Sequence, residues 1–389
     1  MKILAIDGNS ILNRAFYGIR ALSTKDGRFT NGIYGFLTIL MKLRDEVKPD
    51  GVAIAFDLKA PTFRHKMYDG YKANRHGMPP ELAQQLPVLK ELLVALGYKI
   101  ISLEGYEADD ILGTVAEMCK DGNECYIATG DRDSFQLVRD NVTVLLPHTK
   151  MGTTTTEIYT PVRIKEEYGV TPLQMIDIKA LQGDASDCIP GVAGVGQKTA
   201  GDLIQKFGTI QNIYDNIDTL EIKENLKNKL VNDKEKAFLS YTLGTIINNV
   251  PIECSLNDLI PANADEQKVR EMLADLEMFK IIEKLNFSAP TVAEKKEEKP
   301  FIIASRNKNG AYSIATLCRK KGQNLYRTPR AESTLFVDNP NSPIGVFGYH
   351  DKLILKFPLL INNYRIYMQD LASDTSEDIT QLVDISGNR

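Results

Sequence analysis

The chain has 389 residues, which is enough for two or three domains with a sizeable core. Its 43% apolar and 25% charged residues are typical of a soluble globular protein. No apolar run approaches the roughly 20 residues that cross a bilayer, and the start M-K-I-L-A-I-D-G lacks the layout of a signal peptide. We therefore expect a cytoplasmic protein without a membrane partner. The five cysteines form no C-x-x-C pair and the four histidines are not spaced as zinc ligands, which argues against a disulfide framework and a zinc site.

Four apolar, strand-like runs each lead to an acidic residue. The runs are residues 2–7, 51–57, 98–103 and 125–131, and the acids are Asp7, Asp57, Glu107 and Asp131. Helical patterns separate them, for example where apolar residues repeat at helical spacing before Pro49. This order predicts an open α/β fold with a mostly parallel sheet and a site at the carboxyl ends of its strands. The Thr-rich stretch from Pro147 to Thr156 predicts a surface hairpin or loop.

Two motifs enlarge this set of acids. E-A-D-D begins at Glu107 and adds Asp109 and Asp110, and G-D-R-D adds Asp133 to Asp131. Acids in the first turn of a helix often only cap it, which is the simpler interpretation of each motif alone. Capping does not predict an acid after every strand. Clustered carboxylates repel one another unless cations compensate, and a cluster without histidine or cysteine favours Mg²⁺, or Mn²⁺, over zinc.

A basic segment follows the second strand. Arg64, Lys72 and Arg75 are interleaved with aromatic residues such as Tyr71, and we call residues 63–75 the strap. Cations contact phosphates and aromatic rings stack on unpaired bases, so this composition favours a strap over single-stranded nucleic acid. A solvated charged loop is the alternative. The position directly after Asp57 places the strap near the acids and favours the first interpretation.

From about Pro172 to about residue 288 helical patterns dominate, and a glycine-rich turn opens this region. The turn and its helix supply the candidate nucleic-acid contacts Gly191, Gly194, Gly196, Lys198 and Thr199. Backbone N–H groups at such a turn bind phosphate without reading sequence. A dinucleotide-binding turn is excluded because no strand precedes the glycines. An ordinary helix–helix turn remains an alternative, although Asp184 and Asp187 just upstream add two carboxylates beside it.

The end of the chain differs in composition. P-T-V-A-E-K-K-E-E-K-P is typical of a flexible linker, and the β-like runs beyond it predict a small, incomplete α/β unit without paired acids. We expect four parts: residues 1–171, the α/β domain; 172–288, the helical region; 289–300, the linker; and 301–389, the last unit.

The motifs taken together resemble a known family. The set comprises A-I-D-G-N-S, A-F-D, Y-K-A-N-R, E-A-D-D, T-G-D-R-D and G-D-A-S-D-C-I-P-G-V-A-G-V-G-Q-K-T-A. In this order they resemble the 5′ nuclease, or flap endonuclease, domain of bacterial DNA polymerase I over the first 288 residues. The resemblance implies a PIN/flap-endonuclease-like fold with a helical arch, followed by a helix-hairpin-helix (H3TH) region.

The resemblance also implies two metal positions. The first would use Asp7, Asp57, Glu107 and Asp109, and the second Asp131, Asp133 and Asp187, with Asp110 and Asp184 acting directly or through water. Lys72 and Arg75 would contact the scissile phosphate from the arch and act in catalysis with Asp109 and Asp131. Arg64 and Tyr71 would bind nucleic acid beside them. The turn at 191–198 would grip duplex DNA, where such elements often hold K⁺.

The implied activity is that of a monomeric, structure-specific 5′-3′ exonuclease and flap endonuclease in replication and repair. Its substrates would be duplex DNA with a 5′ flap or displaced strand, and RNA primers. Residues 301–389 faintly resemble the opening of a 3′ exonuclease-like domain, expected to be inactive, and no polymerase domain is expected. The alternative is a non-catalytic junction-DNA-binding module that uses only the turn and the strap.

Overall fold

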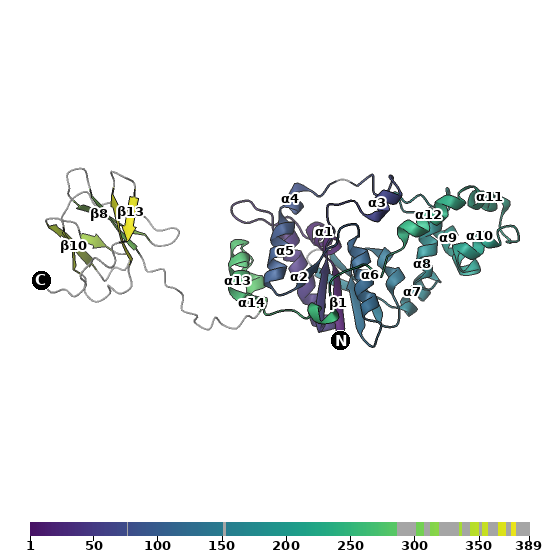
Figure 1. The fold of residues 1–389 in the computed structure, drawn as a ribbon, viewed down its shortest axis with the longest axis horizontal. Helices are drawn as coiled ribbons and strands as arrows, with labels where there is room; N and C mark the ends of the chain where they lie inside the picture. The colour runs from purple at the N-terminus through teal and green to yellow at the C-terminus, as the bar shows by residue number, and fades with distance from the viewer. Residues whose placement is uncertain are drawn as a thin grey trace. The chain divides into compact units, whose positions relative to one another are not determined.

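The structure is a computed structural model (Figure 1). It describes residues 1–285 except 76 and 151–152, together with seven strand segments between 301 and 378. The chain forms two compact units, Met1–Phe287 and Ser288–Arg389. The expected linker at 289–300 lies outside the described residues. Among the helices that the structure describes, none is both long and apolar enough to cross a membrane.

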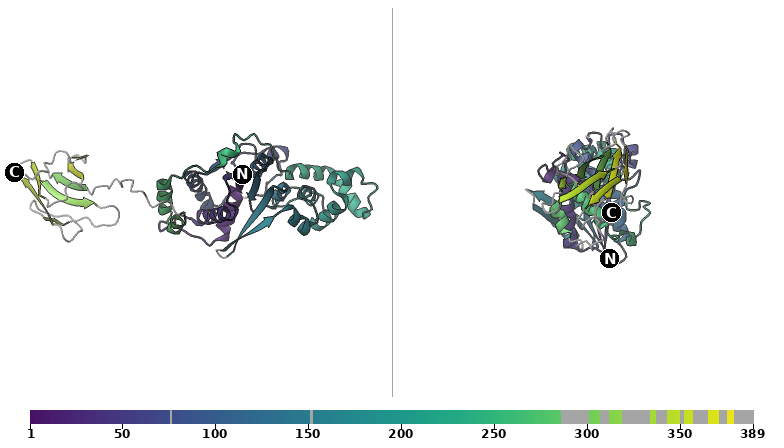
Figure 2. Two further views of the ribbon diagram at one scale, coloured as in Figure 1. Left: turned by 90° about the horizontal axis from the view of Figure 1, so that it is seen from below. Right: turned by 90° about the vertical axis from the view of Figure 1, so that its left-hand side faces the viewer.

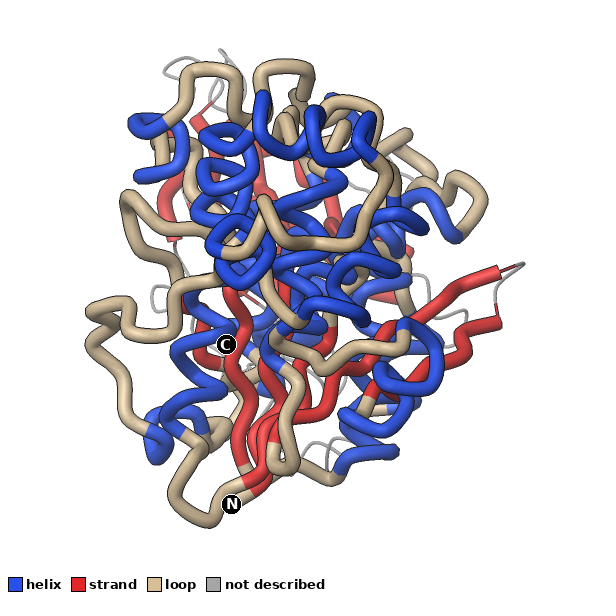
Figure 3. The backbone as a smooth tube through the Cα atoms, turned by 90° about the vertical axis from the view of Figure 1, so that its right-hand side faces the viewer, coloured by secondary structure: helices blue, strands red, loops and turns tan. Residues whose placement is uncertain are grey.

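The first unit is built on a six-stranded sheet with the strand order β3-β2-β1-β4-β5-β6. The strands are β1 (Lys2–Asp7), β2 (Gly51–Ala55), β3 (Lys99–Ile101), β4 (Glu124–Ala128), β5 (Val142–Lys150) and β6 (Thr153–Tyr159). The first five are parallel and β6 is antiparallel to β5. This confirms the mostly parallel α/β sheet. The Thr-rich stretch belongs to the β5–β6 hairpin, which projects beyond the rest of the sheet (Figure 3).

Alternate side chains of the central strands enter two different cores. Leu4 and Ile6 of β1 pack with α1 (Gly8–Gly18), α2 (Asn31–Val47) and α5 (Gln85–Ala95). Ile3 and Ala5 face the other side, toward α6 (Ala108–Met118). Successive strand residues point to opposite faces, so a strand buried on both faces is apolar on both, as residues 3–6 of β1 are. Helices therefore cover both faces of the sheet.

The strap and the residues after it form only short helices. These are α3 (Phe63–Met67) and α4 (Pro80–Ala83), with turns between them. The helical arch expected from the resemblance is therefore short and interrupted in the described residues. In Figure 1 this segment passes over the ends of the strands toward the helical region.

The helical region extends from one side of the sheet (Figures 1 and 2). It contains α7 (Pro161–Tyr168), α8 (Gln174–Gln182), α9 (Gln197–Phe207), α10 (Ile210–Asp215), α11 (Glu224–Asn232) and α12 (Lys234–Gly244). The helices α8 to α12 share a core of their own, around Leu181, Ile204 and Ile213, whereas Ile164 of α7 packs in the α/β core. The last two helices, α13 (Glu266–Asp275) and α14 (Phe279–Lys284), pack instead with α5 and α2 on the α/β core.

The second unit has two sheets in its described segments. One joins β9 (Thr334–Phe336), β10 (Pro343–Tyr349) and β11 (Lys352–Lys356). The other joins β7 (Phe301–Arg306), β8 (Tyr312–Cys318), β12 (Arg365–Asp370) and β13 (Thr375–Asp378). Only strands occur among these segments, so the helical part of the expected α/β unit lies outside the described residues.

Candidate functional site

The acids at the strand ends also cap the helices that follow. Asp7 ends β1, and its carboxylate accepts the backbone N–H of Ser10 at 2.9 Å in the first turn of α1. Asp131 accepts the N–H of Asp133 at 2.9 Å at the start of a short 3-10 helix, Arg132–Leu137. The capping interpretation and the acid-cluster interpretation thus describe the same residues. These caps hold the carboxylates of Asp7 and Asp131 at the carboxyl edge of the sheet, and Asp57 accepts the N–H of Ala108 at 2.8 Å at the start of α6.

Most of the expected site residues surround one cavity of about 220 Å³. Its acids are Asp7, Asp57, Glu107, Asp109, Asp131, Asp133 and Asp187. Arg64, Tyr71, Lys72 and Arg75 of the strap complete the wall. Both regions of the first unit therefore contribute to the cavity, because Asp187 follows α8 in the helical region.

Excess negative charge marks this cavity. Burial, then the neighbouring Asp57, raises the pKa of Asp7 to about 7. Burial and repulsion from Asp7 raise the pKa of Asp109 well above its usual value, and burial raises the pKa of Asp57. Carboxylates with raised pKa values signal charge that the protein does not compensate. The donors are all oxygen atoms, so the site suits hard divalent cations better than zinc.

A second group lies at the helical side. Asp133, Asp184 and Asp187 each offer a carboxylate oxygen, and these oxygens lie within 4.8 Å of one another. Lys179 of α8 is only 6% exposed and forms ion pairs with Asp133 and, at 2.8 Å, with Asp184. The sequence interpretation missed Lys179. The sequence did contain a sign of this role: Lys179 is the one charged residue in the apolar run I-K-A-L. This run ends shortly before the acidic residue Asp184.

Lys179 changes the charge state of the acids that it contacts. Burial raises the pKa of Asp184, but Lys179 and Ser186 outweigh it and lower that pKa to about 2. The pKa of Asp133 is raised to about 6, because burial outweighs the same lysine there. Lys179 therefore neutralises only part of the negative charge of this group of acids.

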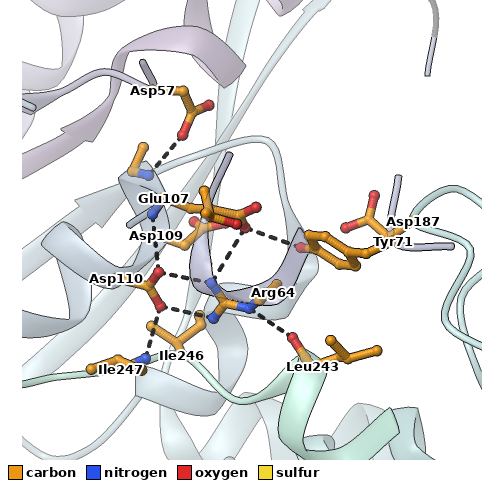
Figure 4. A network of polar contacts seen from close by, with 12 residues as sticks. Asp57, Arg64, Tyr71, Glu107, Asp109, Asp110, Asp187, Leu243, Ile246 and Ile247 are labelled. Atoms are coloured by element: carbon orange, nitrogen blue, oxygen red, sulfur yellow. Dashed lines mark hydrogen bonds and ion pairs between the residues drawn. The ribbon is translucent and has the colours of Figure 1, made fainter. Parts of the chain in front are cut away.

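Arg64 and Asp110 form a buried pair beneath the cavity (Figure 4). Two hydrogen bonds of 2.8 Å join them, and Asp110 also accepts the N–H groups of Glu107 at 3.0 Å and Ile247 at 2.9 Å. Four donors fill both oxygens of Asp110, which leaves no oxygen for a cation. Arg64 is 2% exposed and also donates to the carbonyl of Leu243. This corrects two expectations: Arg64 is not presented to nucleic acid, and Asp110 is not placed as a metal ligand.

The rest of the strap reaches the acids directly. Tyr71 is 4% exposed and donates its hydroxyl to Glu107 at 3.0 Å, so it is not free to stack on a base, which corrects that expectation. Lys72 lies 2.9 Å from Glu107, and Arg75 lies 2.5 Å from Asp187. Burial raises the pKa of Glu107, but Lys72 and then Arg64 outweigh it, so the pKa is lowered.

The glycine-rich turn leads into α9 as expected. Gly191 and Gly194 have φ of 59° and 74°, which favour glycine. Gly191 is buried and donates its N–H to Ser240 Oγ at 2.9 Å, so it shapes the turn and does not offer its N–H to a ligand. The exposed part consists of Gly194, Gly196 and Lys198, with Thr199 half-buried.

Comparison with known proteins agrees with this geometry. Residues 2–169 match the family model of the 5′-3′ exonuclease N-terminal resolvase-like domain, and residues 170–267 match that of the 5′-3′ exonuclease C-terminal SAM fold. DNA polymerase I of Caldicellulosiruptor bescii is 42% identical over 289 residues, and that of Bacillus subtilis is 43% identical over 285 residues. These matches cover 74% and 73% of this chain but 34% and 32% of the relatives. The chain thus spans about a third of their length.

Solved structures share the fold. Bacteriophage T5 flap endonuclease, in a pseudo-enzyme-product complex with DNA and metal ions, has a TM-score of 0.51 and 20% identity over 73% of this chain and 98% of its own. T5 5′-exonuclease with bound divalent metal ions has a TM-score of 0.52 at the same identity and coverage. The catalytic core of Rad2 in complex with DNA substrate has a TM-score of 0.51 and 18% identity over 74% of this chain and 92% of its own. These structures show the shared fold, and the two adjoining family matches show that residues 2–267 of the chain belong to the 5′-3′ exonuclease family.

Proposed function

We propose that this protein hydrolyses phosphodiester bonds of 5′ flaps and displaced strands at duplex DNA junctions, RNA primers included, in replication and repair. One observation carries the proposal. Acids from the strand ends and from the helical region surround a single cavity, with Lys72 and Arg75 on its wall. An acid-rich cavity beside two cations suits a phosphate that is held by metal ions. A bacterial enzyme of this kind acts on DNA in the cytoplasm and would work as a monomer.

Two divalent cations, Mg²⁺ or in its place Mn²⁺, would balance the acids. Asp7, Asp57 and Asp109, with Glu107, would hold the first. Asp133, Asp184 and Asp187, with Asp131, would hold the second, so Asp184 becomes a direct ligand in this assignment. When bound, such cations make a water molecule a stronger nucleophile and stabilise the leaving oxygen.

The strap supplies positive charge that is already in place. Lys72 and Arg75 are held at the cavity by Glu107 and Asp187. A phosphate entering the cavity would take over these cations as its own partners, and they would neutralise charge that develops on the phosphoryl oxygens. Asp110 holds the N–H of Glu107, so with Arg64 it positions the start of α6.

The exposed part of the glycine-rich turn would bind the duplex. Gly194 and Gly196 offer backbone N–H groups, and Lys198 and Thr199 add donors at the start of α9. Such contacts fix the position of DNA without reading its sequence. The exposed backbone of this turn would hold a K⁺ ion, which would add positive charge for a phosphate. Proteins of the same fold have been crystallised with DNA, which supports DNA as the substrate.

A flap-cleavage assay tests the proposal. A 5′-labelled flap duplex is incubated with the protein in Mg²⁺, in EDTA and with Asp109→Ala. We expect cleavage only by the parent in Mg²⁺, because Asp109 lies in the cavity without a compensating cation. Asp45→Ala removes an exposed acid on α2 and serves as the matched control. Cleavage by Asp109→Ala, or junction binding by the parent without turnover, would favour the non-catalytic binding module.

A second assay separates catalysis from binding. Lys72→Ala is expected to slow cleavage much more than it weakens duplex binding, because Lys72 reaches the cavity and not the glycine-rich turn. Cleavage rate and duplex affinity are measured on the same flap substrate. An equal loss of both would make Lys72 an anchor for the duplex.

A further inference from the structure

The strap lies against the loop that precedes the glycine-rich turn, which we call the acidic loop (residues 184–189). Lys72 donates its backbone N–H to the carbonyl of Asp187 at 2.9 Å. Two residues later, the side-chain amide of Asn74 donates to the carbonyl of Ala185 at 2.9 Å. These two hydrogen bonds fix one stretch of chain against the other. They set which strap residue faces which loop residue.

Apolar packing supports this junction. Tyr71, Ile189 and Leu243 are at most 4% exposed and form one small cluster, against which Tyr68 and Leu239 also pack. The cluster joins the strap, the acidic loop and α12. The strap and the helical region therefore meet in a defined packing arrangement at this point.

The acidic loop is in turn fixed to the glycine-rich turn. Asp184 and Ile189 exchange backbone hydrogen bonds of 2.9 and 2.8 Å, which close the loop. Gly191 then donates to Ser240 of α12 at 2.9 Å. Only Pro190 separates the closed loop from Gly191, so the loop lies next to the start of the glycine-rich turn.

Backbone strain occurs on both sides of the junction. Lys72 and Cys188 both have φ of 55°, in the left-handed region that non-glycine residues seldom adopt. Such conformations persist only where surrounding contacts hold them, and they concentrate at functional sites. The Lys72 N–H bond to Asp187 joins one of these residues to the direct neighbour of the other, and the Asn74 bond lies two residues further along the strap.

The contacts at the junction differ in how they respond to cations. Arg75 pairs with the carboxylate of Asp187, which the proposed function assigns to a metal ion, so a bound cation competes with this ion pair. The hydrogen bonds of Asn74 and of the Lys72 N–H go to backbone carbonyl groups. Contacts to neutral carbonyl groups do not compete with a metal ion for a carboxylate.

We propose that Asn74 is a positioning residue that keeps Lys72 and Arg75 in register with the acidic loop, beside the glycine-rich turn. This inference rests on the proposed function. Asn74 itself lies in the exposed part of the strap and acts through its neighbours. Its amide makes the only side-chain hydrogen bond to a backbone carbonyl between strap and acidic loop within the described residues.

Asn74→Ala tests the inference in two ways. Without metal, hydrogen exchange of the strap amides is followed in EDTA, and we expect about three- to tenfold faster exchange at Lys72, the range expected for loss of one neutral hydrogen bond. With Mg²⁺, we expect single-turnover flap cleavage to slow by about the same factor while duplex affinity, measured in EDTA, stays unchanged. Asn74→Gln keeps an amide donor and is expected to recover part of both losses.

The control is Asn216→Ala, which removes a similar exposed amide contact, to the carbonyl of Asn212 at 3.0 Å, at the end of α10. It should leave strap exchange and cleavage unchanged. Unchanged exchange in Asn74→Ala, or a loss of duplex affinity equal to the loss of rate, would overturn the inference. Failure of the parent to cleave flaps would instead overturn the proposed function, and the exchange experiment in EDTA would still decide the role of Asn74.

Discussion

The guanidinium of Arg64 and the carboxylate of Asp110 face each other through two hydrogen bonds of 2.8 Å beneath the acidic cavity. Arg64 comes from the strap and Asp110 from the first turn of α6. Both also bind backbone groups just after α12, where Arg64 donates to Thr245 and Asp110 accepts from Ile247. One ion pair therefore ties three segments together under the site.

Removing one partner of this pair is expected to destabilise the fold. Asp110→Ala leaves a buried guanidinium without a counter-charge and should lower the free energy of unfolding by about 3–5 kcal/mol. Urea unfolding followed by circular dichroism measures it. Arg28→Ala is the control, since Arg28 pairs with Asp275 at a side chain that is 43% exposed and should cost less than about 1 kcal/mol. Equal losses in the two variants would contradict this account.

The sequence predicted the positions of the acidic side chains better than those of the basic side chains. Asp7 and Asp57 follow apolar strands, and parallel strands end at one edge of the sheet, so their convergence follows from the pattern alone. Asp109 and Asp110 are adjacent on a helix and so point about 100° apart, which is why one faces the cavity and the other is buried against Arg64.

Other features depend on packing that a local pattern does not contain. The mixture of cations and aromatic residues in the strap predicted its proximity to the acids but not the direction of each side chain, and Arg64 and Tyr71 point inward. Helical spacing likewise predicted helices near residue 270, but α13 and α14 contribute Val269 and Ile281 to the α/β core and not to the helical region. Which core a helix joins depends on contacts with residues that are distant in the sequence.

The metal-free protein should lose stability as pH rises toward neutrality. Burial is the main reason that the pKa of Asp7 is raised to about 7 and that of Asp133 to about 6. Between about pH 4 and about pH 7 the folded protein holds protons that the unfolded chain has lost, so the free energy of unfolding falls with rising pH. The pKa of Asp184 is lowered to about 2, so the stability that this residue contributes is lost only as the pH falls below about 4.

Urea unfolding in EDTA, in steps from about pH 5 to about pH 8, measures this dependence. Asp7→Asn should flatten it, since the amide does not titrate. Excess Mg²⁺ should oppose the fall, because cations bind the deprotonated carboxylates. A free energy of unfolding that rises over this range in EDTA would contradict the assigned charge states.

Lys179 is expected to supply part of the positive charge that a metal ion would bring to Asp133, Asp184 and Asp187. Lys179→Met should destabilise the metal-free protein by about 3 kcal/mol or more at pH 8, because Asp133 and Asp184 lose their buried partner. Mg²⁺ should restore much of this loss, since a divalent ion can replace the ammonium group. Lys236→Met, at a lysine that is 57% exposed and pairs with Asp233, should cost less than about 1 kcal/mol. A loss that Mg²⁺ does not reduce would show that Lys179 acts only in folding.

The two ends of the glycine-rich turn should respond differently to alanine. At Gly191, φ is 59° and an added Cβ would lie 2.3 Å from the backbone nitrogen of Gly183, so Gly191→Ala should cost more than about 2 kcal/mol. At Gly196, φ is −95° and the space for a Cβ is open, so Gly196→Ala should cost less than about 1 kcal/mol.

Urea unfolding separates these two effects, and duplex affinity in EDTA adds a second measurement. Gly196→Ala should keep the fold yet weaken duplex binding, because a methyl group would stand where the exposed turn approaches a phosphate. Gly191→Ala should lose binding only as far as it loses the fold, since its N–H already binds Ser240. Equal stability losses would contradict the strain assigned to Gly191→Ala, and full duplex affinity in Gly196→Ala would mean that the exposed half of the turn does not contact the duplex.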